Sequence, residues 1–149
     1  MHPVRLVLET QEFQPLEALQ QWHQSLLEVG DMAAAEAMFI GRVRSVTSGG
    51  DTVRALELEH YPGMTERQIH QLGEELLLAH GARRALVHHR VGLVQPDEPI
   101  VLLAVQADRR GMAQRCCQGL LEALKHDAPF WKREWRGDQG FWLDGNTPL

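Results

Sequence analysis

Cysteine is scarce in this chain: the only two are the neighbouring residues Cys116 and Cys117. Adjacent cysteines seldom have disulfide geometry, and two of them do not make a disulfide framework, so a reducing cytoplasm is the predicted compartment. The sequence also lacks a run of 18 apolar residues and the apolar stretch of a signal peptide. Neither a membrane span nor a secretory leader is therefore predicted.

The common motifs of nucleotide binding and hydrolysis are missing as well. The sequence contains no GxGxxG, GxxxxGK[ST], HExxH, CxxC or GxSxG. The formal net charge of −5 argues against a nucleic-acid partner, although it is compatible with a local basic pocket. What is present is a 149-residue chain with 44% hydrophobic residues, which predicts a single globular domain over residues 1–149.

Hydrophobic periodicity predicts elements in the order β-α-β-β-α-β-β-α-β-β, and this mixture of hairpins and helices favours an α+β fold over a doubly wound α/β fold. We expect strands at 4–8, 33–46, 53–60, 85–94 and 100–107, the last one buried on both faces. We expect helices from Pro15 to before Gly30, from a capping box at Thr65 and Gln68 to before Gly81, and from Arg109 to His126. The turn at 48–51 predicts that the strands on either side pair as a hairpin, and the aromatic C-terminal segment is expected to pack back on the body.

Histidines and cysteines offer two candidate sites, and each has a simpler interpretation. His88 and His89 are consecutive in a predicted strand, so they point to opposite faces and do not easily share a metal ion. Cys116 and Cys117 lie in the middle of a predicted helix, away from the helix N-terminus that lowers the pKa of a reactive thiol. We therefore predict no metal site and interpret the two thiols as core residues.

The basic residues are more informative. Arg109 and Arg110 follow a buried strand and begin a helix, which is a natural position for binding an anion. Lys125 ends that helix and Lys132 follows a break at Pro129. Two neighbouring lysines lower each other's pKa and can then act as acid and base or stabilise an oxyanion. A solvated helix face explains Arg109, Arg110 and Lys125 equally well, so both interpretations stay open at this point.

Four segments together resemble the large, catalytic subunit of molybdopterin synthase (the MoaE-type family). They are Phe39–Arg44 (FIGRVR), Leu58–Glu66 (LEHYPGMTE), His89–Gly92 (HRVG) and Ala128–Glu134 (APFWKRE). They occur in the family's order and with similar spacing. The resemblance implies an α/β hammerhead-type fold and a homodimer in which each copy binds one small ubiquitin-like sulfur carrier.

In such an enzyme the carrier's C-terminal Gly-Gly thiocarboxylate gives its sulfur to cyclic pyranopterin monophosphate, forming the dithiolene of molybdopterin. No bound cofactor is implied, because the carrier supplies the sulfur. The resemblance identifies Lys125 and Lys132 as catalytic residues and Arg44, Arg109 and Arg110 as substrate-binding residues. Arg109 departs from the family pattern, since it replaces a histidine and so removes a group that titrates near neutrality.

Two other functions are weighed against this one. The substitution at Arg109 is compatible with a non-catalytic pterin- or phosphate-binding relative, although binding alone would rarely need both lysines. The eight histidines allow a metal-handling module, which stoichiometric zinc or nickel in the purified protein would favour.

Overall fold

The structure, a computed structural model, describes residues 2–143 and consists of three helices and two four-stranded sheets. The helices are α1 (Pro15–Glu28), α2 (Met64–His80) and α3 (Arg110–His126). The first sheet contains β1 (Val4–Glu9), β2 (Ala35–Arg42), β4 (Arg84–Arg90) and β6 (Pro99–Ala107). The second contains β3 (Ala55–His60), β5 (Gly92–Val94), β7 (Phe130–Arg136) and β8 (Gln139–Leu143).

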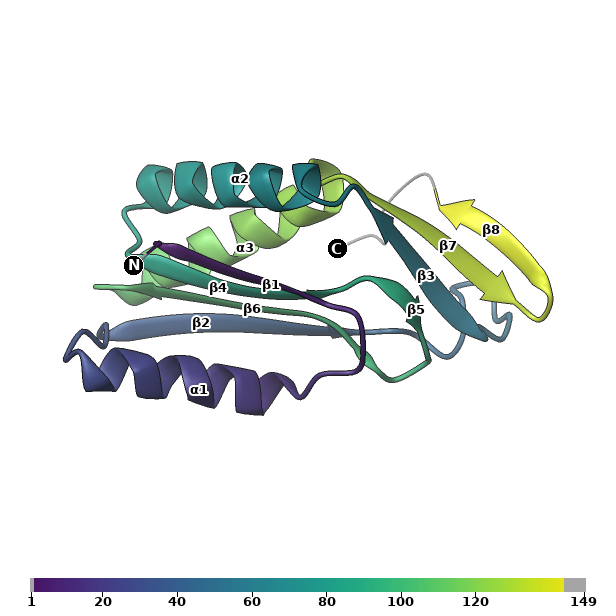
Figure 1. Ribbon diagram of the computed structural model, residues 1–149, viewed down its shortest axis with the longest axis horizontal. Coiled ribbons are helices and arrows are strands. Elements are labelled where there is room, and N and C mark those ends of the chain that lie inside the picture. The colour runs from purple at the N-terminus through teal and green to yellow at the C-terminus, as the bar shows by residue number, and fades with distance from the viewer. Residues whose placement is uncertain (1, 144–149) are drawn as a thin grey trace.

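The first sheet has the order β1-β4-β6-β2 and is covered by helices on both faces (Figure 1). On one face, Trp22 and Leu26 of α1 pack against Leu86, Leu102 and Ala104. On the other face, α2 and α3 cover a core that includes Val87, Leu103 and Leu120. Because both faces are covered, β6 is almost entirely buried, as its continuous apolar sequence predicted.

The second sheet has the order β5-β3-β7-β8 and extends beyond the end of α3 (Figure 1). Every strand pair in it is antiparallel. The chain passes from the first sheet to the second between β4 and β5, at Gly92, whose φ of +86° suits glycine. The predicted single strand at 85–94 is therefore wrong, because this backbone turn divides it into two strands of different sheets.

The predicted hairpin between 33–46 and 53–60 is also wrong. β2 pairs with β6 along its whole length, whereas β3 pairs with β5 and β7 in the other sheet. The turn forms as expected, but it closes only a single bridge between Val46 and Thr52. Residues of β2 contribute to the cores on both faces of the first sheet, and this burial outweighs the local turn signal.

The capping box of α2 is shifted from its predicted position. The backbone N–H of Gly63 donates to Oε2 of Glu66 at 2.8 Å, so the helix begins at Met64. Thr65 instead accepts a hydrogen bond from the backbone N–H of Tyr61 and donates one to the carbonyl of Pro129, at 3.2 Å. This side chain thereby ties the start of α2 to the segment just before β7. The α+β class, by contrast, is confirmed.

Gly73 of α2 lies close to Val4 of β1. A Cβ atom added at Gly73 would lie 2.8 Å from Cγ2 of Val4, which is fully buried. We expect Gly73→Ala to destabilise the protein by about 1–3 kcal/mol in urea unfolding, because this contact cannot relax without moving the core. The matched control is Gly119→Ala in α3, where the nearest atoms are 3.4 Å away and the change should be neutral or stabilising. Equal stability of both variants would contradict this packing.

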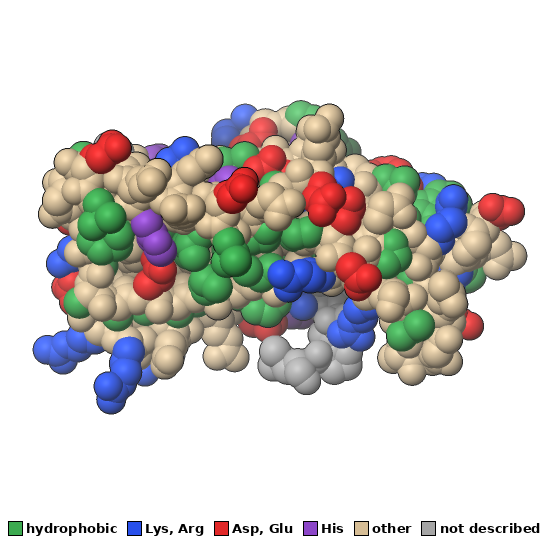
Figure 2. All heavy atoms as spheres, turned by 90° about the horizontal axis from the view of Figure 1, so that it is seen from below, with side chains coloured by type: hydrophobic (Ala, Val, Ile, Leu, Met, Phe, Trp, Pro, Cys, Tyr) green, Lys and Arg blue, Asp and Glu red, His purple; other side chains and the backbone are tan. Residues whose placement is uncertain are grey.

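The surface carries charges of both signs. On the face shown in Figure 2, acidic and basic side chains are interspersed. Among the described residues, no helix is long and apolar enough to cross a membrane.

Candidate active site

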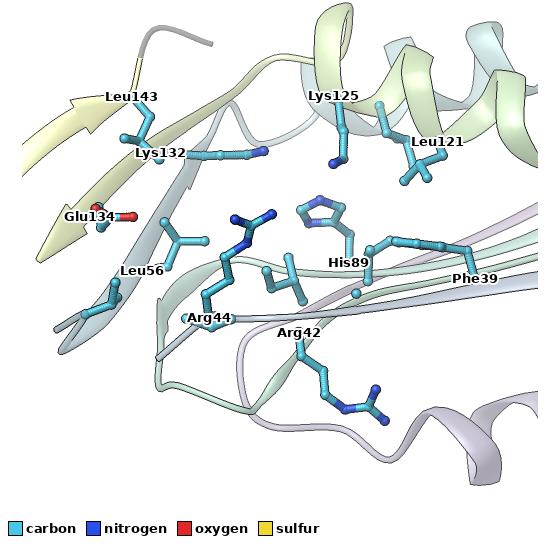
Figure 3. Close-up of a pocket in the computed structure, with 16 residues that line it drawn as sticks. Phe39, Arg42, Arg44, Leu56, His89, Leu121, Lys125, Lys132, Glu134 and Leu143 are labelled. Atoms are coloured by element: carbon cyan, nitrogen blue, oxygen red, sulfur yellow. The ribbon is translucent and has the colours of Figure 1, made fainter. Parts of the chain in front are cut away.

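A pocket of about 320 Å³ lies where the two sheets and the C-terminal end of α3 meet. Its walls are formed by β2 and the segment after it, by β3, β4 and β6, by α3, and by β7 and β8 (Figure 3). Much of the lining is apolar. The charged or titratable residues that line it are Arg42, Arg44, His89, Lys125, Lys132 and Glu134.

Lys125 is positioned by α3. It lies in the last turn of this helix, where a cation interacts favourably with the unpaired carbonyl groups. Its neighbours Ala123 and Leu124 are buried. The helix ends at His126, and Pro129 prevents its continuation. Lys125 therefore lies at the edge of the pocket, on a rigid element.

Lys132 is positioned by β7, which begins two residues earlier. It lies opposite Leu58 of β3 and Leu143 of β8 in the second sheet. Its pKa is lowered from 10.5, first by burial and second by the positive charge of Lys125. Lys125 and Lys132 are the only lysines in the sequence, and both line this pocket. The fold thus brings together the two residues for which the family resemblance implies a catalytic role.

Arg44 also points into the pocket, from the segment after β2, whereas the side chain of Arg42 points away from it (Figure 3). Glu134 adds a carboxylate to the lining, and its Oε1 accepts a hydrogen bond from Nε of Arg136 at 2.9 Å. Three inward cations therefore face one carboxylate that already has a partner. Such a pocket favours an anionic ligand.

Arg109 and Arg110 lie outside this pocket. They are exposed at the start of α3, with Arg109 as its N-cap residue. Fifteen residues separate Arg110 from Lys125, which corresponds to about 22 Å along a helix. Within one copy of the chain, the structure does not bring these two arginines together with the two lysines.

His89 also lines the pocket, although the sequence analysis considered it only as a metal ligand and gave it no role in this site. It is buried, and its ring stacks on Phe130 with centroids 4.0 Å apart. Its Nδ1 lies 2.8 Å from the carbonyl oxygen of Arg90, and burial lowers its pKa to about 4. His88 points to the other face, where Nδ1 lies 2.9 Å from Oε1 of Glu9. The predicted opposite orientation of the two histidines is confirmed. Because consecutive strand residues point to opposite faces, this pattern indicated that one of the two would face the pocket side of the sheet.

The cysteines are core residues, as interpreted from the sequence. Both are buried and unpaired, and burial raises the pKa of each thiol to about 11. They are therefore protonated near neutral pH and unsuited to act as nucleophiles. Within residues 2–143, no group of three or more His, Cys, Asp or Glu side chains is arranged to hold a metal ion.

The buried His89 predicts a loss of stability in acid. Its folded-state pKa of about 4 lies below 6.5, so the unfolded chain binds the proton more readily. The stabilising contribution is complete above pH 6.5 and is lost as the pH falls toward 4. We expect the wild type to lose about 2 kcal/mol of unfolding free energy between pH 7 and pH 5 from this residue. Urea titrations should show a smaller loss for His89→Gln, and an equal loss would contradict this assignment.

Comparison with known proteins decides the family. Residues 9–127 match the family model described as "MoaE protein". The chain belongs to the MoaE family. It is 42% identical over 113 residues to the molybdopterin synthase catalytic subunit of Ralstonia nicotianae, covering 76% of this chain and 64% of that protein. The same-named protein of Haemophilus influenzae is 33% identical over 97% of this chain and 92% of its own length.

The three-dimensional structure agrees with membership of the MoaE family. The solved structure of molybdopterin cofactor biosynthesis protein E from Burkholderia multivorans is similar with a TM-score of 0.77 and 32% identity. This similarity covers 98% of the present chain and 91% of that one. The family model ends before β7, whereas the likeness to the Burkholderia protein extends through almost the entire chain.

Proposed function

We propose that this MoaE-family chain is the catalytic subunit of a molybdopterin synthase. It transfers sulfur from the thiocarboxylated C-terminus of a small ubiquitin-like carrier to cyclic pyranopterin monophosphate. The observation that carries this proposal is the convergence of Lys125, Lys132 and Arg44 on one pocket. The substrate's phosphate and the carrier's terminal thiocarboxylate are both anions, and this pocket suits them.

Each transfer replaces a carbon–oxygen bond of the substrate with a carbon–sulfur bond and breaks the carbon–sulfur bond of the thiocarboxylate. Hydrolysis supplies the oxygen with which the carrier's acyl carbon leaves as a carboxylate. A dithiolene contains two sulfur atoms, so two carriers are consumed per product. Lys132, whose pKa is lowered, is suited to accept and return protons. Lys125 is suited to stabilise the oxyanion that develops at the carrier's acyl carbon.

Arg44 is assigned to substrate binding at the edge of this pocket. Arg109 and Arg110 are too far along α3 to act in the pocket of their own copy. Their predicted role in substrate binding therefore requires that a second copy of the chain presents them. This fits the homodimer that the family resemblance implies, with one carrier bound to each copy. The cytoplasm is the compartment in which we place this reaction.

Replacement of Arg109 by histidine, the residue usual in the family, tests what this position does. If Arg109 only binds an anion, we expect Arg109→His to keep kcat within about threefold and to raise the KM for the pterin substrate, because a neutral imidazole binds phosphate less strongly. Steady-state kinetics measure both constants. A rise in kcat of tenfold or more would mean instead that the arginine has removed an acid or base.

Complementation of a bacterium that lacks its own molybdopterin synthase catalytic subunit tests the proposed function. We expect the wild-type chain to restore the activity of a molybdenum enzyme such as nitrate reductase. A variant with both lysines replaced, Lys125→Ala with Lys132→Ala, is the matched control and should not restore it. Restoration by the double variant would contradict the assignment of this pocket.

A further inference from the structure

The proposed reaction gives no role to His89, a titratable residue of the pocket. His89 lines the pocket from β4 and is 6% exposed. Figure 3 shows its ring below the side-chain ends of Lys125 and Lys132. Its position is fixed on both sides, by the stack on Phe130 and by the hydrogen bond to its neighbour's backbone.

The hydrogen bond of His89 determines which ring nitrogen carries the proton. A carbonyl oxygen can only accept, so Nδ1 must donate its hydrogen to the carbonyl of Arg90. In the neutral ring, Nε2 then has a free lone pair and acts as an acceptor. Nε2 is therefore the ring atom that can accept a hydrogen bond from a donor in the pocket.

Burial is the main reason that the ring of His89 stays neutral. Lys132 on β7 and His60 on β3 also disfavour a positive charge on it. Lys125 on α3 and Arg44 after β2 add further positive charge to the same pocket. With a pKa of about 4, the imidazole remains an acceptor throughout the neutral and alkaline range.

The geometry couples His89 to Lys132 in particular. Phe130, which stacks on His89, is the first residue of β7, and Lys132 is two residues later on the same side of the strand. We propose that His89 is a positioning residue for Lys132, and that its Nε2 accepts a hydrogen bond from the protonated side-chain nitrogen of this lysine. This inference rests on the proposed function of Lys132 in sulfur transfer. A neutral imidazole in this position orients Lys132 by a hydrogen bond. Because it carries no negative charge, it leaves the positive charge of the pocket available to an anionic ligand.

Two variants separate the acceptor from the ring. His89→Phe keeps an aromatic ring against Phe130 but removes the acceptor, whereas His89→Gln keeps an acceptor near the position of Nε2 but removes the ring. Because Lys125 and Lys132 are the only lysines, pulse acylation with acetic anhydride across pH 6–11, followed by peptide mass spectrometry, titrates each of them separately. This measurement requires no sulfur transfer.

We expect the pKa of Lys132 to fall by about one unit in His89→Phe, because its charged form loses a hydrogen bond, and to stay near the wild-type value in His89→Gln. In the sulfur-transfer assay, kcat should fall about tenfold in His89→Phe with little change in KM, and His89→Gln should restore most of it. An unchanged titration of Lys132 in His89→Phe, or a larger defect in His89→Gln than in His89→Phe, would overturn the inference.

A measurement on the wild type covers the case in which His89→Phe does not fold. Nitrogen-15 NMR of the imidazole reports the tautomer and whether Nε2 accepts a hydrogen bond. We expect the Nδ1-protonated tautomer and a hydrogen-bonded Nε2 whose resonance changes in Lys132→Ala. A proton on Nε2, or no change in that variant, would overturn the inference. If sulfur transfer fails while both physical measurements agree with expectation, the proposed function is wrong and the positioning of Lys132 stands.

Discussion

Replacement of Lys132 by alanine is expected to reduce the rate of sulfur transfer by about 10³-fold, since general acid–base catalysis typically contributes about 10²–10⁴. The half-buried lysine has a pKa lowered by burial and by Lys125, so it gives up its proton more readily than an exposed lysine. The loss should appear in kcat, measured as dithiolene product under saturating carrier and pterin. The circular dichroism spectrum and the oligomeric state of the protein should not change.

Arg133→Gln provides the matched control for Lys132→Ala. Arg133 is the next residue of the same strand, and its guanidinium stacks over the ring of Trp142, 4.1 Å from its centroid, and does not line the pocket. We expect this variant to keep kcat within about threefold. A comparable loss of kcat in Arg133→Gln would mean that the defect arises from disturbance of β7 and not from loss of the lysine.

Replacement of Lys125 by glutamine should reduce kcat about 10²-fold and also change the response to pH. Removal of its positive charge ends the repulsion that helps to lower the pKa of Lys132, so that pKa should rise. If neutral Lys132 is the active form, the remaining activity then appears at higher pH than in the wild type. The pH–rate profile measures this, and acylation of Lys132, then the only lysine, measures its pKa directly.

Two results would contradict this account of Lys125. One is a pH–rate profile that stays in place while kcat falls, which would show that the two lysines do not interact. The other is a shift of the profile to lower pH. Lys125→Arg is the control that keeps the charge. We expect it to leave the pKa of Lys132 low while kcat still falls, because an arginine occupies more space at this edge of the pocket.

Local patterns predicted the elements of the fold well, whereas the partners of the strands were not predictable in the same way. Helix starts and ends depend on nearby residues such as Pro15 and Gly81, so a single sequence contains that information. The pairing of β2 with β6, and not with β3, depends on which faces are buried by helices far away in the sequence. The turn at 48–51 indicated the wrong partner, because it favoured pairing of the strands on either side of it.

The candidate site was likewise predictable from the sequence only in part. The family resemblance assigned Lys132 from its segment Ala128–Glu134 and Lys125 from its place at the end of the preceding helix, and the fold brings both to one pocket. The sequence analysis already placed Arg109 and Arg110 at the start of a helix and Lys125 at its end, and in the 17-residue helix this separates them by about 22 Å. His89 was missed because period-two alternation gives the face of a side chain but not what covers that face.

Sulfur transfer with purified components tests the central claim most directly. The full chain is mixed with thiocarboxylated carrier and cyclic pyranopterin monophosphate, and the dithiolene is measured after oxidation to a fluorescent pterin. The same carrier ending in a carboxylate is the control. We predict product only with the thiocarboxylated carrier, at two carriers consumed per product, and almost none in Lys132→Ala. A folded protein that binds the carrier but forms no product would contradict the account and would favour a non-catalytic pterin-binding relative. Arg109 would then be the first residue to replace, by the histidine that is usual in the family.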